Sequence, residues 1–437
     1  MANPIFNLTK MPDVRKRLLF SMAMLAVYRL GVFIPTPGIN VAKLKLFFSG
    51  QGGQTIFELI NLFSGGALEQ FSIFALGIMP YISASIIFQL LTVSLPALKR
   101  LQEEGEAGRN KINQWTRYGT VALSLVQGFF ISYGLLQNGY VNADSSGAGF
   151  LFTTMISLAA GTCFIMWLGE QITERGIGNG ISLIIFSGIV ARLPGGFRDA
   201  WVNRDAYFGV FGFVLLLGFL FLIIATIIFF ERCQRRVPIH FAKRVVGNKM
   251  YGGQSSHLPL KINMAGVIPP IFASSILLFP ATIASFSHSP KLQALAGFFT
   301  TGWFYTTMYI AAIIFFTYFY TAVTFNPNDV AENLKRNGGF IPGIRPGTPT
   351  SDYLDNILTR ITLGGALYLS AVCVLPRLLI SQFNIPGSLA YTFGGTSVLI
   401  VVGVAMDTVG QMESYLISRN YDGFLGAKGG RFKGRRS

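Results

Sequence analysis

Charge is what this sequence has least of: Asp, Glu, Lys and Arg together make up 12% of its 437 residues, against about 25% in soluble domains. A soluble chain of this length would expose a large surface that needs such residues, so the shortage argues against soluble and disordered classes. Acidic residues are the scarcer kind, with 19 against 35 basic ones and a formal net charge of +16. A basic and apolar chain is typical of a membrane protein whose positive charge lies in its loops.

Ligands for metals and disulfides are also few, with three cysteines and three histidines. The cysteines lie far apart without a CxxC spacing and the histidines form no ligand spacing, so we expect neither a disulfide framework nor a metal site. P-loop, HExxH and GxSxG motifs are missing, which argues against an enzyme and gives no cofactor to expect. The residues concerned are Cys163, Cys233, Cys373, His240, His257 and His288.

Long hydrophobic runs, in contrast, are abundant: ten segments approach the ~20 residues that a helix needs to cross ~30 Å of hydrocarbon. They are residues 18–35, 71–93, 119–137, 150–169, 181–193, 207–230, 264–285, 302–325, 358–380 and 393–417. The fifth is short, and it reaches full length only if the preceding Gly176-Ile-Gly-Asn-Gly180 is partly embedded. No strand precedes these glycines, so we interpret them as a flexible helix start rather than a phosphate-binding loop.

Ten spans place both termini on one side of the membrane, and the basic residues indicate which side. Alternate segments between the spans, with the adjoining span ends, hold 27 of the 35 Lys and Arg, the opposite set holds 7, and Arg29 lies well inside the first span. By the positive-inside rule, both termini face the cytoplasm. Five spans in each half also have the parity of an inverted-topology repeat. We divide the chain into residues 1–195, residues 196–418 and a basic tail at 419–437.

Residues 56–71 are too apolar for an exposed linker and too polar to span a membrane. One interpretation is an amphipathic helix that lies on the membrane surface. The other is a short helix folded back into the interior of the protein, where a water-filled funnel solvates Asn61 and Glu69. The pattern by itself leaves both interpretations open.

Two loops on the cytoplasmic side, residues 231–263 and 326–357, are longer than ordinary connections, which raises the odds of a functional role. The first carries seven basic residues and one acid, Glu231. In the second, two prolines and four glycines surround Arg345, and they predict a tight turn that presents this arginine at its tip. The charge and reach of both loops suit docking of a large anionic partner, such as a protein or ribosomal RNA.

A few charged residues lie inside the predicted spans or at their ends. Arg29 and Asp407 lie well inside, and Glu170 and Glu231 lie at the ends. Charges at membrane depth are functional hypotheses by default. Here, structural pairing or a carboxylate that faces a pore is at least as consistent with the pattern as a proton relay.

Long strings of residues give the chain a close resemblance to the SecY family of protein-translocase channel subunits over nearly its whole length. The strings are FIPTPG at 33–38, NLFSGG at 61–66, FSIFALGIMPYI at 71–82, WLGEQITERGIGNG at 167–180, NMAGVIP at 263–269 and PGIRPG at 342–347. Strings of this length are far more specific than short motifs, and chance similarity between apolar spans does not produce them.

The resemblance implies an all-α polytopic membrane protein, with ten transmembrane helices in two inverted five-helix halves around a central hourglass pore. It implies a channel that translocates unfolded secretory polypeptides and releases signal sequences and membrane segments into lipid, through a lateral gate between spans 2–3 and 7–8. A ring of β-branched apolar side chains would seal the waist, blocking ions without binding a passing chain. Matched by position, the ring is Ile78, Ile82, Ile181, Ile185, Ile271 and Ile400.

The resemblance also assigns residues 62–72 to a plug in the outer funnel, which favours the folded-back interpretation. Glycines 65 and 66 would let the backbone turn there. The implied plug residues are Phe63, Ser64, Gly65, Gly66, Ala67, Leu68 and Glu69. The implied docking residues in the two long loops are Arg235, Arg236, Lys243, Arg244 and Arg345.

The partners that the resemblance implies are the small membrane subunits SecE and SecG, the SecA motor ATPase, the ribosome, signal sequences, nascent polypeptides and membrane lipid, all at the plasma (inner) membrane. Such a channel has neither a catalytic site nor a cofactor. The rival from another class is a secondary transporter of a small solute, which predicts a polar site near the midplane. Six isoleucines and little convergent charge favour a seal over a binding pocket, and an intramembrane enzyme lacks a nucleophile with its base.

Overall fold

The computed structural model describes residues 12–41, 43–44, 61, 64–137, 139–141, 147–202, 204, 209–241, 244–246, 249–251, 255–285, 302–383 and 394–428. The chain forms two compact units. The first unit joins residues 1–194 with residues 400–437, and the second unit is residues 195–399. The predicted inverted halves stay a prediction, because these units group most of the last span, from Ile400 on, with the first part of the chain.

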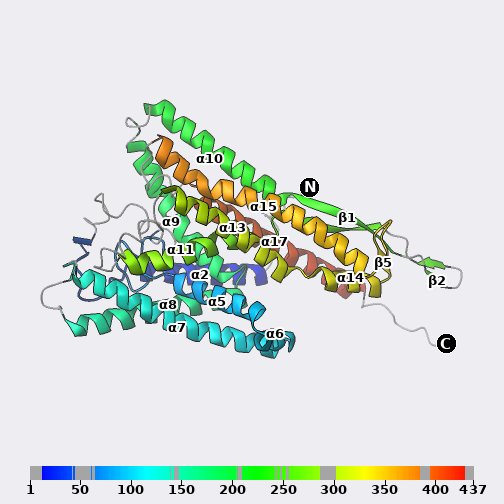
Figure 1. Cartoon of the computed structure of the whole chain (residues 1–437), viewed down its shortest axis with the longest axis horizontal. Coiled ribbons are helices and arrows are strands. Elements are labelled where there is room, and N and C mark those ends of the chain that lie inside the picture. Colours follow the sequence, from blue (N-terminus) through cyan, green and yellow to red (C-terminus); the bar gives the residue numbers. More distant parts are fainter. Residues whose placement is uncertain are drawn as a thin grey trace. The chain divides into compact units, whose positions relative to one another are not determined.

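Each of the ten predicted spans coincides with a helix (Figure 1). These helices are α2 (Pro12–Val32), α5 (Met79–Ser94), α7 (Glu106–Gln137), α8 (Ala148–Arg175), α9 (Gly180–Val202), α10 (Gly209–Arg232), α11 (Ile268–Ser285), α13 (Gly302–Thr324), α15 (Thr348–Phe383) and α17 (Gly395–Lys428). Among the described residues, seven helices are long and apolar enough to cross a membrane, and an eighth counts if the bent pair α5 and α6 (Pro96–Glu103) is one span. The prediction of a helical, multi-pass membrane protein is confirmed.

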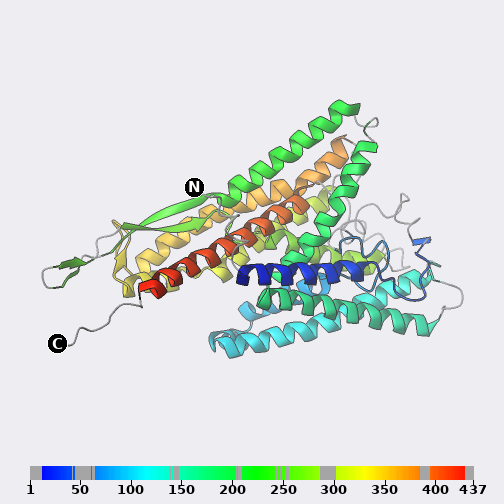
Figure 2. The ribbon, with the colours of Figure 1, turned by 180° about the vertical axis from the view of Figure 1, so that it is seen from behind.

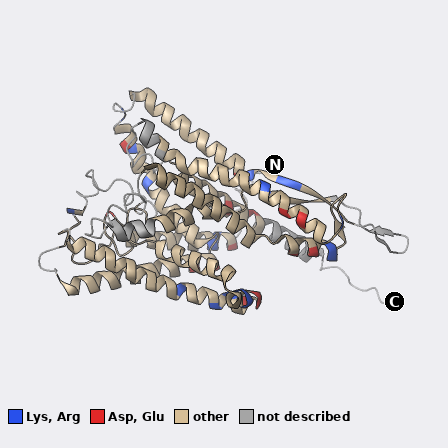
Figure 3. Ribbon diagram, viewed as in Figure 1, with Lys and Arg blue, Asp and Glu red and all other residues tan. Residues whose placement is uncertain are grey.

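In each unit, charged side chains gather at the ends of the apolar helices and on the short elements between them (Figure 3). In the first unit, Lys and Arg gather on α6 and the start of α7, and in the second unit they lie on strand β1 (Gln234–Phe241) and on α14 (Pro327–Arg336). Residues 118–137, 209–230 and 361–376 carry no charged side chain at all. Uncharged stretches of this kind are what the hydrocarbon core of a membrane requires.

In the first unit, α7 packs against α5 and α8, and α2 packs against α8, as Figure 2 shows from behind. The chain bends by 98° between α5 and α6. The bend occurs at Leu95, which has extended dihedral angles (φ −104°, ψ 117°), because the following Pro96 disfavours a helical conformation in the residue before it. The bend separates an apolar helix from the short charged helix that follows it.

The glycine-rich segment before α9 is a helix start, as predicted. The Asn179 side chain caps the helix by accepting hydrogen bonds from the backbone amides of Ile181 (3.1 Å) and Ser182 (3.4 Å), a role that asparagine favours. Embedding of these glycines stays a prediction, but α9 is long enough to cross a membrane without residues 176–179. The helix instead gains its length at the other end, where it continues through Pro194 to Val202.

In the second unit, the two long loops contain strands that the sequence did not suggest. Strand β1 pairs antiparallel with β4 (Ser255–Lys261) and, at its far end, with β5 (Gly339–Phe340). A small hairpin of β2 (Arg244–Val246) and β3 (Lys249–Tyr251) extends between β1 and β4. Since β5 belongs to the second loop, the sheet joins both loops into one body.

Two prolines lie within this sheet, Pro238 opposite His257 and Pro259 opposite Arg236. Just before the ladder, the Ile262 amide donates to the Cys233 carbonyl at 3.0 Å. Counting in steps of two from this hydrogen-bonded pair, both prolines fall at the alternate positions, whose backbone amides point away from the partner strand. Neither proline therefore removes a hydrogen bond from the ladder.

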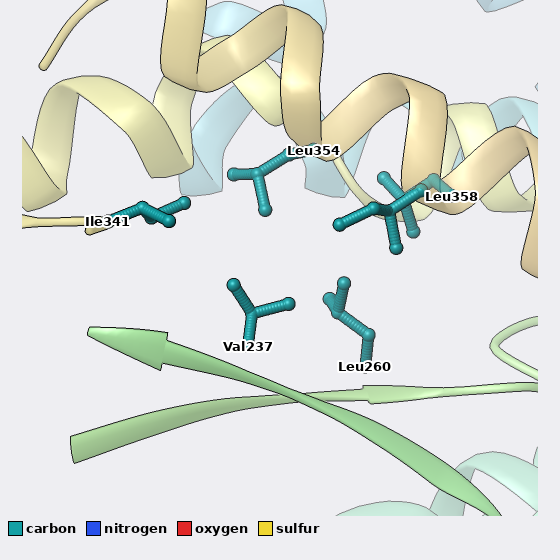
Figure 4. Packing of buried hydrophobic residues seen from close by; sticks show 6 residues of the cluster. Val237, Leu260, Ile341, Leu354 and Leu358 are labelled. Carbon is teal, nitrogen blue, oxygen red and sulfur yellow. The ribbon is translucent and has the colours of Figure 1, made fainter. Parts of the chain in front are cut away.

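One face of the β1–β4 hairpin packs on the start of α15 through a compact apolar core (Figure 4). The core consists of Val237, Leu260, Ile341, Leu354, Ile357 and Leu358. We call the body formed by β1, β4, β5, the 341–347 turn and residues 348–361 the hairpin module. Burial of six branched apolar side chains gives this module a fixed shape, since each contributes roughly 1.5–3 kcal/mol.

Candidate functional site

The most unusual feature of the first unit is a stretch of buried, non-helical backbone at residues 64–77, which we call the buried turn segment. The sequence predicted a short interior helix followed by a span from residue 71, but residues 64–78 form consecutive turns and α5 begins only at Met79. Ser64, Ala67, Leu68 and Phe71 are buried. The burial fits the folded-back interpretation rather than a helix on the membrane surface.

Side chains of α2 hold the buried turn segment by its backbone carbonyls. The Tyr28 hydroxyl donates to the Ser64 carbonyl at 3.0 Å, and the Arg29 guanidinium donates to the Gly65 carbonyl at 3.0 Å. Just beyond α2, the Thr36 amide and hydroxyl both donate to the Phe71 carbonyl. Arg29, whose role the sequence left open, therefore stabilises turns that have no helical hydrogen bonds of their own.

Asn61 and Glu69 close the segment on itself. The Asn61 side chain accepts from the Glu69 amide at 3.2 Å and donates to the Glu69 carboxylate at 3.4 Å. The same carboxylate lies 3.9 Å from the guanidinium of Arg192 on α9, in a pair that is partly exposed. The two polar residues thus have partners within the protein and do not rely on solvation by a water-filled funnel alone.

Glycine is required at the centre of the segment. Gly65 has φ +66°, and a Cβ atom placed there would lie 2.7 Å from the Cα of Gly188 on α9. Neither the dihedral angle nor the space tolerates a side chain. Gly66 also has a positive φ (+93°), but a Cβ atom placed there would have nothing within 4 Å. The segment is therefore in close contact with α9 at Gly65, whereas there is open space at the Cβ position of Gly66.

The six isoleucines of the predicted ring are all among the described residues. Five belong to the first unit and Ile271, on α11, belongs to the second. All are buried except Ile181, which is half-buried. The pairs at 78 and 82 and at 181 and 185 are spaced by four residues, one helical turn, so that each pair shares a face.

Three of the five predicted docking residues have described side chains. Arg235, Arg236 and Arg345 are exposed on the hairpin module. Arg345 lies in the predicted turn, which a hydrogen bond from the Ile344 amide to the Ile341 carbonyl (3.1 Å) closes. The arginines of β1 lie about five residues, roughly 17 Å along the strand, from the end that pairs with β5. Lys243, the side chain of Arg244 and the plug residue Phe63 lie outside the described residues.

Pattern alone missed three residues that position the buried turn segment: Tyr28, Thr36 and Arg192. Arg29 inside a span is a signal that polar backbone lies nearby. Because Tyr28 is the adjacent residue on α2, the same signal could have drawn attention to it. Among the residues with described positions, no group of three or more His, Cys, Asp or Glu could hold a metal ion.

Solved structures share this fold at low sequence identity. One described as a protein conducting channel has a TM-score of 0.64 at 17% identity and covers 95% of this chain and 98% of its own. A SecY structure, whose plug domain is described as stabilising the closed state and maintaining a membrane seal, reaches 0.62 at 17% identity with the same coverage. Sec61 from a canine ribosome-channel complex reaches 0.61 at 16% identity, covering 95% and 98%. The fold is that of helical, protein-conducting membrane channels.

Closer relatives define the family. The SecY family profile matches residues 72–409. The protein translocase subunit SecY of Pseudomonas aeruginosa is 51% identical over 415 residues, 94% of this chain and 92% of the relative. The protein translocase subunit SecY of Escherichia coli K12 is 50% identical over 426 residues, which cover 94% of this chain and 94% of the relative. The chain belongs to the SecY family and is a non-enzymatic, multi-pass channel subunit of the Sec translocase, as the resemblance predicted.

Proposed function

We propose that the chain conducts unfolded secretory polypeptides across the plasma (inner) membrane, with both termini in the cytoplasm, and releases signal sequences and membrane segments into lipid between spans 2–3 and 7–8. The observation that carries this proposal is the buried turn segment, residues 64–77. Non-helical backbone at membrane depth is tolerated only where protein covers it or a water-filled cavity reaches it. A helix would satisfy the same backbone without help, so the turns need a functional reason.

In this proposal residues 62–72 are the plug of a resting channel, and the six isoleucines form the seal at its waist. In one related SecY structure, the plug domain is described as stabilising the closed state of that channel and maintaining a membrane seal. The polar contacts of the segment favour a part that can leave, because hydrogen bonds can be exchanged for water at a small net cost. Its buried apolar side chains, such as Phe71, favour the resting position. Branched apolar side chains suit the seal, since they offer a passing chain no specific bond.

The hairpin module is the proposed docking surface for the SecA motor ATPase or the ribosome on the cytoplasmic side. Two similar structures are channel complexes with canine and yeast ribosomes. Exposed Arg235, Arg236 and Arg345 give the module the positive charge that an acidic protein or ribosomal RNA would meet. SecE, SecG and membrane lipid complete the proposed assembly, since the chain is one subunit of a translocase.

Crosslinking of a stalled secretory chain tests the proposal. Single cysteines at Ile82 and Ile271 are placed in an otherwise cysteine-free complex, with exposed Phe340→Cys as a control outside the path. We expect both pore positions, and not the control, to crosslink to the stalled chain. An absence of crosslinks at both pore positions in an assembled, membrane-inserted complex would contradict the proposed path.

A further inference from the structure

The two ends of the β1–β4 hairpin connect to helices α10 and α11, and a buried polar contact lies where they do so. Asn263 follows β4 and is almost fully buried. Its side-chain amide donates to the carboxylate of Glu231, at the end of α10, at 3.0 Å. It also donates to the Gly266 carbonyl at 3.1 Å, in the turn that leads into α11. One side chain thus joins the end of one helix to the start of the next.

Helix α15 packs closely against the backbone of Ile262 and Asn263. A Cβ atom at Gly365 would lie 2.7 Å from the Ile262 carbonyl oxygen and 3.8 Å from the Cα of Asn263. One turn further along α15, Tyr368 stacks on Phe230 of α10 with ring centroids 4.3 Å apart. The neighbouring Gly364, by contrast, has nothing within 4 Å of a Cβ position and is exposed. Only one of two adjacent glycines is therefore needed for close packing.

No flexible linker separates the hairpin module from α11. The ladder continues to the hydrogen bond between Ile262 and Cys233, and the very next residue is the buried Asn263. Met264 packs against the apolar core of the module, and α11 begins four residues later, at Ile268. Only a short and partly buried stretch, residues 262–267, thus lies between the hairpin and α11, the helix that carries Ile271.

We infer that Glu231, Asn263 and Gly365 form a joint that transmits displacement of the hairpin module to α11, so that docking of a partner moves the helix bearing a ring residue. Glu231 and Asn263 are positioning residues in this inference, because they act through the start of α11. A hydrogen bond from the buried Asn263 to the part-buried carboxylate of Glu231 is strong enough to couple two elements, and its loss is felt at about the tenfold level. The inference rests on the proposed docking role of the module, and it adds how docking acts on the channel.

The test separates binding from opening in the complete translocase complex, reconstituted into planar bilayers. Asn263→Asp sets a carboxylate against Glu231 and removes the donor. We expect SecA to bind this variant within about twofold of the parent chain, while the ion conductance evoked by SecA with a signal peptide falls about tenfold or more. Adding Glu231→Gln to the same chain restores a donor facing an acceptor with the direction reversed, and should restore the conductance.

A second pair of variants keeps the test independent of charge. Gly365→Ala inserts a methyl group into the contact with Ile262 and should reduce evoked conductance without loss of binding, whereas Gly364→Ala should behave as the parent chain. Evoked conductance that stays at the parent level in both Asn263→Asp and Gly365→Ala would overturn the inference. Binding that falls in parallel with conductance would also overturn it, since the joint would then only hold the docking surface in shape. A parent chain that neither binds SecA nor conducts would instead contradict the proposed function.

Discussion

The buried turn segment and the hairpin module both interrupt the series of apolar helices, but contacts that water can replace play a larger part in the first than in the second. The segment at residues 64–77 buries apolar side chains such as Phe71 and Phe74. Its carbonyls also accept hydrogen bonds from Tyr28, Arg29 and Thr36, and one partly exposed ion pair adds to these polar contacts. The hairpin module is held by a regular ladder between β1 and β4 and by an apolar core. Water can replace the hydrogen bonds and the ion pair of the segment, whereas it opposes exposure of the apolar core of the module.

This difference matches the work proposed for each region. A part that must leave a pore needs contacts that are individually weak and that water can satisfy once it has moved. A part that receives a large partner needs a shape that persists under load. Four substitutions test this contrast, and they are taken from the largest expected effect to the smallest.

Leu260→Ala should damage the hairpin module most. Leu260 is fully buried in the module core, and truncation of such a leucine costs about 2–5 kcal/mol. Because trypsin must open the strand to cut after the exposed Arg235 or Arg236, cleavage there should accelerate roughly 30-fold or more. Exposed Ser256→Ala on the same strand is the control. Cleavage at the parent rate in Leu260→Ala would show that the core does not hold the strands.

Arg29→Met should loosen the buried turn segment. The change removes the charged donor to the Gly65 carbonyl, a contact worth about 1.5–3 kcal/mol. Resting ion conductance in planar bilayers should rise about tenfold. Exposed Arg198→Met removes a charge without this contact and should leave the conductance unchanged. Equal conductance in the two variants would remove Arg29 from the seal.

Gly65→Ala compared with Gly66→Ala isolates the close approach to α9. Both residues have positive φ angles, but only Gly65 meets the backbone of Gly188. The difference between the two variants is therefore the overpacking cost, about 1–3 kcal/mol. We expect a higher resting conductance from Gly65→Ala. If Gly66→Ala leaks as much, backbone strain rather than packing decides the effect.

Glu69→Gln should have the smallest effect. The carboxylate lies 3.9 Å from Arg192 in a partly exposed pair, and such pairs contribute about 0.2–1 kcal/mol. Gln keeps an acceptor for Asn61, so resting conductance should rise less than about fivefold, and the difference should shrink at high salt. An effect as large as that of Arg29→Met would mean that the ion pair is the main latch.

The helical frame could be predicted because its signals are local. Runs such as residues 209–230 carry no charge, and the alternation of basic loops fixes their order across the membrane. The six ring positions could be named only by resemblance, because an isoleucine in a seal and an isoleucine in a helix interface have the same pattern.

The hairpin module could not be predicted in the same way. Pro238 and Pro259 argue against strands unless their register is known. The pairing of His240 with Phe340 joins residues one hundred positions apart, and no local pattern announces such a contact. The roles of Tyr28 and Thr36 could not be predicted for a related reason, since their hydrogen bonds reach a segment more than thirty residues away in the sequence.

Hydrogen–deuterium exchange of the reconstituted complex, with and without a stalled secretory chain, tests the central contrast most directly. Amides of residues 64–77 should lose protection when the stalled chain is present, while those of strands β1 and β4 should keep theirs. Unchanged protection at 64–77 with a chain held in the pore, or equal loss in both regions, would contradict the account.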